Sequence, residues 1–153
     1  MEPFLPISSK SLVDRYRVIH TERMQGLPIV NNALDVEGVG FCPFEEHQIG
    51  VLITPWFINL VLLPGTDIGS KLEQGSKSTL KFPSGPIEFT TARDEVLGTY
   101  LTAVLFRSAA EFPNQETARD IAAEVLRELF NEANDGRRMS RRALFANVGA
   151  FDA

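Results

Sequence analysis

The hexapeptide Cys42-Pro43-Phe44-Glu45-Glu46-His47 holds the residue types most able to do chemistry in this chain. A thiolate, two carboxylates and an imidazole in one short segment could bind a soft or borderline metal ion. Cys42 and His47 could also act together as nucleophile and general base. No third residue nearby is suited to orient the imidazole. The competing interpretation is therefore an ordinary polar loop with an unrelated thiol.

Elsewhere the sequence offers few catalytic or cofactor-binding patterns. Gly38-Val39-Gly40 has neither the third glycine nor the following helix of a dinucleotide-binding loop. Histidine occurs only as His20 and His47, and paired Cys-x-x-Cys motifs are absent, which argues against a structural zinc site. Ser84 lacks the flanking glycines of a nucleophile elbow. We therefore expect no catalytic residues and no cofactor.

Two other groups of residues suit binding to a protein better than catalysis. Trp56, the single tryptophan, would fill the core if buried, or would anchor an interface if it stood at a turn. Arg137-Arg138 and Arg141-Arg142 form two basic doublets. These are either solvated charges beyond a helix end, or a cluster that grips a carboxylate-bearing partner with Phe145 docking beside it.

Trp56 lies inside an apolar run, Gly50–Gly65, that is shorter than the ~20 residues needed to cross a bilayer. Because Pro55 cannot donate to a central β-ladder, we expect strands at Ile49–Thr54 and Phe57–Leu63 with a tight reversal at Pro55-Trp56. The alternative is a single long strand with a bulge at Pro55.

The reversal predicts which side chains share a face. Ile53 should oppose Ile58, and Val51 should oppose Leu60, with Leu62 on the same face. The other face then carries a second and largely apolar set: Leu52, Thr54, Phe57, Asn59, Val61 and Leu63. Since an antiparallel sheet with one wet face alternates more cleanly, both faces need cover, either from helices of this chain or from a partner.

The remaining pattern predicts an α+β fold. A helix from about Ser9 to Gln25 starts at serine N-caps and ends at Gly26, and a second, with an apolar stripe, follows Asn114 and stops near Gly136. Further strands are expected at Leu34–Phe41, Thr79–Phe82, Pro86–Ala92 and Gly98–Phe106, with Cys42–His47 as a connection. The result is an antiparallel sheet of about five strands packed with an N-terminal and a C-terminal helix.

Composition indicates one globular domain over residues 1–153, with its core at roughly 8–145. The 153 residues are 44% hydrophobic and 23% charged. A net charge of −5 argues against nucleic-acid binding. The single cysteine fits a reducing compartment, and Met1–Ile7 has no secretory pattern. We expect a cytoplasmic protein without membrane insertion.

The run Gly50–Gly65 closely resembles the hallmark of the NiFe-hydrogenase assembly chaperones of the HybE/HupJ type. The resemblance spans about Leu34 to Phe145 and is densest from Gly50 to Phe106. Further segments are similar to the same family: Phe82-Pro83-Ser84-Gly85 followed by Phe89 and Thr90, the Tyr100-Leu101 strand, and Arg141-Arg142-Ala143-Leu144-Phe145.

The resemblance implies a cytoplasmic accessory protein and not an enzyme. Members of the family assist maturation of uptake or membrane-bound hydrogenases. They act on precursors of the large or small subunit before cofactor assembly or twin-arginine export. Some relatives carry a rubredoxin domain, whose two Cys-x-x-Cys motifs this sequence lacks.

The expected partner-binding residues are Thr54, Pro55, Trp56 and Phe57, with a second patch at Arg141, Arg142 and Phe145. An apolar surface of this kind would also permit a homodimer. Two alternative functions stay open. One is a small-molecule-binding α+β module with a pocket between sheet and helix. The other is a thiol- or metal-handling accessory protein that uses Cys42 and His47.

Overall fold

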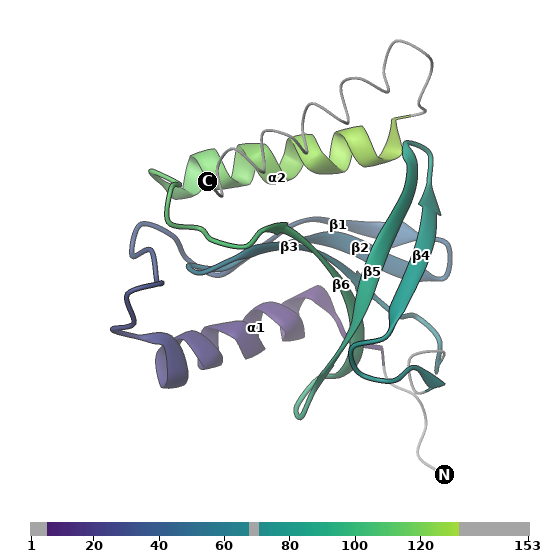
Figure 1. The fold of residues 1–153 in the computed structure, drawn as a ribbon, viewed down its shortest axis with the longest axis horizontal. Coiled ribbons are helices and arrows are strands. Elements are labelled where there is room, and N and C mark those ends of the chain that lie inside the picture. Colours follow the sequence, from purple (N-terminus) through teal and green to yellow (C-terminus); the bar gives the residue numbers. More distant parts are fainter. Residues whose placement is uncertain (1–5, 68–70, 132–153) are drawn as a thin grey trace.

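The computed structural model describes residues 6–67 and 71–131. Within them the fold is α+β as predicted, with a six-stranded antiparallel sheet between two helices (Figure 1). The helical elements are α1 (Ser9–Ile19), the π-helical turn η1 (His20–Met24) and α2 (Gln115–Phe130). The strands are β1 (Glu37–Phe44), β2 (His47–Ile53), β3 (Ile58–Leu63), β4 (Lys77–Phe82), β5 (Gly85–Asp94) and β6 (Gly98–Phe106).

The sheet joins two meanders side by side, in the order β1-β2-β3-β6-β5-β4. The chain passes from β3, in the middle of the sheet, to β4 at the far edge, and then returns through the β4–β5 and β5–β6 hairpins. β6 therefore pairs with β3, although β4 and β5 lie between them in the chain. In the described sheet, β1 and β4 are the two edge strands.

The β2–β3 hairpin has the register that the sequence predicts. Ile53 pairs with Ile58 and Val51 pairs with Leu60, so the chain reverses at Pro55-Trp56. The alternative of one long strand bulged at Pro55 is wrong. The reversal matters for function because it places the tryptophan at a tip of the sheet instead of in a ladder.

Each face of this hairpin is covered by a helix of the chain itself (Figure 1). On the α2 side, Val51, Leu60 and the other side chains of their face join the buried stripe of α2 in the larger core cluster. On the α1 side, Leu52, Val61 and Leu63 pack with Leu12 of α1 and with Tyr100. Phe89 and Phe106 belong to the same core cluster and fill the layer between the sheet and α2.

The helices begin where the sequence predicts. Ser8 caps α1 through a reciprocal pair of hydrogen bonds with Ser11, and Asn114 caps α2 by accepting the N–H of Thr117. The first helix is α-helical to Ile19 and then widens to a π-turn, followed by Gly26 at φ +82°. α2 ends at Phe130, while the predicted stop at Gly136 lies outside the described residues. No helix of the described part of the chain is long and apolar enough to span a bilayer.

The prediction for the segment around β1 was wrong in its bounds. Cys42–Phe44 continues the strand instead of forming a connection, and only Glu45 and Glu46 make the turn to β2. The reason is a bulge: the β1–β2 register shifts between Val39 and Cys42, beside Gly40 at φ +65°. The extra residue restores the pairing, so Cys42–Phe44, which the sequence predicts as part of a connection, lies in the sheet.

Candidate partner-binding surface

Thr54 shapes the turn between β2 and β3. Its hydroxyl accepts the N–H of Phe57 at 2.9 Å and of Trp56 at 3.3 Å, and donates to the carbonyl of Phe57 at 2.8 Å. These contacts use the one donor and both lone pairs of the hydroxyl. The ring of Pro55 holds its φ angle at about −65°, which suits the second position of such a turn. The turn is therefore fixed by its own residues.

Trp56 and Phe57 lie against the end of α1. The Trp56 ring is 6.4 Å from Tyr16 and 5.8 Å from His20, measured between ring centroids. Phe57 meets Tyr16 and Trp56 edge to face, each at 5.8 Å. Edge-to-face pairs at this spacing are favourable because the positive ring edge meets the negative ring face. The aromatic rings thus hold each other in place while both Trp56 and Phe57 stay partly exposed.

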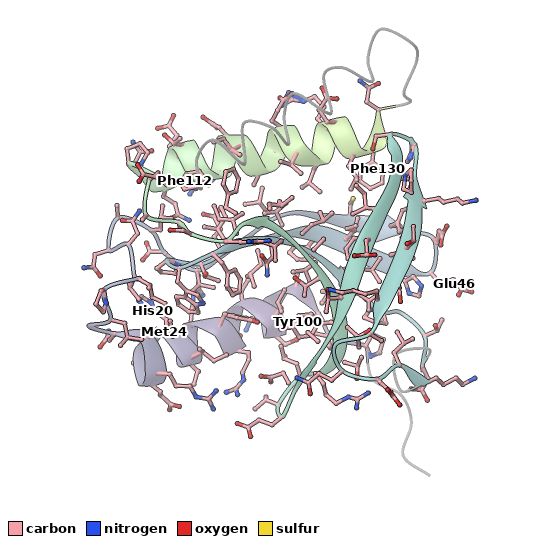
Figure 2. The ribbon with its side chains drawn as sticks, viewed as in Figure 1. His20, Met24, Glu46, Tyr100, Phe112 and Phe130 are labelled. Carbon is pink, nitrogen blue, oxygen red and sulfur yellow. The ribbon has the colours of Figure 1, made fainter. Side chains whose placement is uncertain are left out.

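Asn31 ties three segments together beside the turn. Its backbone N–H donates to the carbonyl of Pro55 at 2.8 Å. Its side-chain amide donates to the carbonyls of Ala109 and Phe112, both at 2.8 Å. The loop after η1, the β2–β3 turn and the connection from β6 to α2 therefore meet at one end of the molecule, where Figure 2 labels His20, Met24 and Phe112.

A polar clamp holds α1, and with it Tyr16, against the β5–β6 turn. The Arg15 guanidinium donates to both carboxylate oxygens of Asp94, at 3.0 and 3.2 Å, and also contacts Glu95 at 3.3 Å. The hydroxyls of Tyr16 and Tyr100 are 2.6 Å apart. Burial raises the pKa of both tyrosines, so both phenols stay protonated at neutral pH. The clamp positions Tyr16 under Trp56.

Of the predicted binding residues, the structure brings four together at the tip. Thr54, at 0% exposure, and Pro55 are buried, so they build the turn. Trp56 and Phe57 are half-buried. Trp56 is therefore neither a fully buried core residue nor a fully exposed interface anchor. The residues of the second predicted patch, Arg141, Arg142 and Phe145, lie outside the described residues.

Exposed apolar residues extend the tip. Leu27 is 43% and Ile29 is 58% exposed, and both lie in the loop between His20 and Asn31, the two residues that contact the turn. We call the set His20, Leu27, Ile29, Trp56 and Phe57 the hairpin-tip surface. Because no charged side chain is a member, it is a site where apolar contact would dominate binding.

Cys42 and His47 lie on neighbouring strands, in β1 and β2, on either side of the Glu45-Glu46 turn. Cys42 lies opposite Ile49 and packs against the α2-side core. The Nδ1 atom of His47 accepts the backbone N–H of Gly65 at 2.9 Å, so that ring nitrogen is already used. In residues 6–67 and 71–131, no group of three or more His, Cys, Asp or Glu side chains is placed to hold a metal ion.

Sequence reasoning missed the residues that support the tip from a distance. Nothing in the sequence around Asn31 indicates its bonds to Pro55, Ala109 and Phe112. No sequence pattern singles out Leu27 or Ile29. Tyr16 lies within the first predicted helix, but a periodic pattern does not name the ring on which a side chain packs.

The chain was compared with known proteins. A family model described as NiFe-hydrogenase assembly, chaperone, HybE matches residues 8–147. Hydrogenase expression/formation protein HupT of Azotobacter chroococcum mcd 1 is 40% identical over 141 residues, which cover 90% of this chain and 93% of that protein. Probable rubredoxin HupJ of Rhodobacter capsulatus is 41% identical over 125 residues, covering 81% of this chain but 45% of that protein. The chain thus spans less than half the length of this HupJ.

The fold is also similar to a solved structure, the solution structure of HybE from Escherichia coli. The TM-score is 0.65 at 21% sequence identity, with 85% of this chain and 81% of that chain covered. At this identity the likeness concerns the fold alone. The family match itself extends beyond the segment Leu34–Phe145 that carries the sequence resemblance, and confirms it. The chain belongs to the HybE family of NiFe-hydrogenase assembly chaperones.

Proposed function

We propose that this protein is a cytoplasmic accessory chaperone that binds an immature NiFe-hydrogenase subunit. Binding precedes cofactor assembly or twin-arginine export, and the client is the precursor of the large subunit, the small subunit or both. The protein makes and breaks no covalent bond. Membership of a family of hydrogenase assembly chaperones supports this proposal.

The observation that carries the proposal is a partly exposed tryptophan on a fixed turn. Thr54 and Asn31 hold the backbone of the turn, while Tyr16 and His20 support the ring of Trp56 from one side. A ring held in this way loses little conformational freedom when a partner covers its open side. Leu27 and Ile29 enlarge the apolar area beside it.

Arg141, Arg142 and Phe145 form a second contact in this proposal. The guanidinium groups would pair with carboxylates of the client and orient it, while the phenyl ring adds apolar area. This part rests on the sequence alone, because these residues lie outside the described ranges. The same apolar tip could associate with a second copy of the chain when no client is present.

Ile29→Ser and Trp56→Ala test the proposal in a pull-down of purified large- and small-subunit precursors. Ile29 is 58% exposed, so its replacement should leave the thermal midpoint nearly unchanged. We expect either change to weaken binding by about tenfold or more, since truncating a central interface residue costs about 2 kcal/mol. Trp56→Ala should also lower stability, because the ring packs on Tyr16 and Phe57.

Val96→Ser is the matched control. Val96 is 66% exposed on the β5–β6 turn and is not a member of the hairpin-tip surface, so this variant should bind as the wild type does. If Ile29→Ser binds both precursors as tightly as Val96→Ser does, the hairpin-tip surface is not the client site.

A further inference from the structure

The two edges of the sheet differ in how they are protected. At β1 the bulge at Gly40 interrupts the ladder, Pro43 lacks an N–H, and Glu37 is held by Arg119 and Gln115 of α2. These are devices that prevent a further strand from pairing. β4 has neither a proline nor a bulge, and its six residues pair with β5 in unbroken register. Its protection is of another kind, the charge of the exposed Lys77 and Lys81.

The hydrogen-bond pattern shows which backbone groups of β4 face outward. Thr91 donates its N–H to the carbonyl of Ser76 at 2.8 Å, so this pair is hydrogen-bonded. Because bonded and non-bonded pairs alternate in an antiparallel ladder, Ser78, Leu80 and Phe82 also bond to β5. The N–H and C=O groups of the alternate residues then point away from β5, toward the open edge: Lys77, Thr79 and Lys81. Pro86, opposite Lys81, has no N–H to give, which agrees with this assignment.

The side chains of the same three residues define the charge of the edge. Lys77, Thr79 and Lys81 are exposed, whereas Leu80 and Phe82 face the α2-side core. Glu88 lies opposite Thr79, and the Lys77 ammonium donates to the Thr90 hydroxyl at 2.8 Å. Two lysines thus flank the outward-facing ladder in a chain whose net charge is −5.

This charge pattern disfavours pairing of β4 with the β4 strand of a second copy of the chain. If two β4 strands paired antiparallel about Thr79, Lys77 of each copy would lie opposite Lys81 of the other. Like charges directly opposite in a ladder are destabilising, whereas a carboxylate in the same position is favourable. The pattern therefore fits an added strand that carries acidic residues at alternate positions.

We propose that the β4 edge binds an extended acidic segment of the client, which adds a strand next to Lys77, Thr79 and Lys81. Main-chain hydrogen bonds would supply affinity, and the two ammonium groups would select Asp or Glu opposite them. The identity of the client rests on the proposed hydrogenase chaperone function. The edge itself rests on the register and charges of β4.

Amide hydrogen exchange tests the edge directly. In the free protein, the amides of Lys77, Thr79 and Lys81 should exchange fast and those of Ser78, Leu80 and Phe82 slowly. We expect the first three to become protected in the complex with a hydrogenase subunit precursor. They should also become protected with a short synthetic peptide that alternates glutamate and valine, but not with the same peptide carrying lysine for glutamate.

Thr79→Pro removes one outward N–H without removing a bond to β5, and Thr79→Val is its matched control. The proline variant should bind the glutamate peptide at least about tenfold more weakly, while the valine variant binds normally. The double variant Lys77→Glu/Lys81→Glu should bind the lysine peptide and no longer bind the glutamate peptide.

Unprotected amides in a complex that does form, or unchanged binding by Thr79→Pro, would overturn the inference. If neither precursor binds at all, the proposed function fails instead. The glutamate peptide still decides the edge in that case, because it needs no hydrogenase subunit.

Discussion

The hydroxyl of Thr54 makes three hydrogen bonds within the turn that carries Trp56, so its removal tests how the tip is held. In Thr54→Val a methyl group replaces the hydroxyl at nearly the same volume. The N–H of Phe57 then loses its partner beside a residue that is 0% exposed, while the C=O of Phe57 keeps the backbone N–H of Thr54 at 2.9 Å. We expect a loss of about 2 kcal/mol in the free energy of unfolding, measured by urea titration, because an unsatisfied buried polar group costs ~1–3 kcal/mol.

Thr54→Ser is the control for this prediction. It keeps the hydroxyl and removes a methyl group, so it should cost about 1 kcal/mol, close to the value of one buried CH₂. A valine variant as stable as the serine variant would mean that the backbone of Pro55 and Phe57 holds the turn without the hydroxyl.

At the scale of single residues, the sequence predicted the turn but not the environment of its ring. Pro55 excludes a central ladder position, and that local fact placed Trp56 at a tip. The half-burial of Trp56 depends on Tyr16 and His20, which come from a distant part of the chain. Such packing partners carry no local signal.

At the scale of elements, the position of α1 depends on the ion pair between Arg15 and Asp94. Burial alone would raise the pKa of the Asp94 carboxyl, but the N–H of Leu97 and the guanidinium of Arg15 outweigh burial and lower it. A group with a lowered folded-state pKa stabilises the fold above its unfolded pKa of about 3.9. That contribution is lost as the pH falls through the folded-state pKa.

We therefore expect the urea midpoint of the wild type to fall as the pH is lowered from about 5 to about 3, as this carboxylate is protonated. Asp94→Asn should be less stable at pH 7 and should approach the wild type at low pH. Arg119 also lowers the pKa of Glu37, so protonation of Glu37 destabilises the fold in the same pH range. The variant Glu37→Gln, measured in parallel, separates the two contributions. A constant difference between Asp94→Asn and the wild type across this range would contradict a role for the charge.

Elements with strong local signals were predicted well. β6 begins at Gly98 and ends at Phe106 as expected, and both helices start at their predicted caps. β1 was not predicted well, because a bulge restores its ladder and lets Cys42, Pro43 and Phe44 pair with β2. The register of such a pair depends on both strands, so the sequence of one strand alone does not predict it.

At the scale of the whole molecule, the sheet curls until the last residues of its two edge strands, β1 and β4, meet on the α2 side. Phe44 at the end of β1 stacks on Phe82 at the end of β4, with centroids 4.5 Å apart, although four strands separate them in the sheet. Phe130 of α2 meets both rings at about 6 Å, and Ser84 donates its N–H to the carbonyl of Leu129. This closure was not predictable from the sequence, because it follows from twist accumulated over the entire sheet.

The closure predicts coupling between the two edges. Phe44→Leu and Phe82→Leu should each destabilise the fold, since each removes a ring from the same aromatic group. A double-mutant cycle in urea should give a coupling energy of about 1 kcal/mol, the usual value of an aromatic pair beyond its buried area. Phe57 lies on the α1 side of the sheet, so the matched cycle of Phe57→Leu with Phe82→Leu should be additive. Additive behaviour of Phe44 and Phe82 as well would mean that β1 and β4 are held independently, and that α2 alone joins the two halves of the sheet.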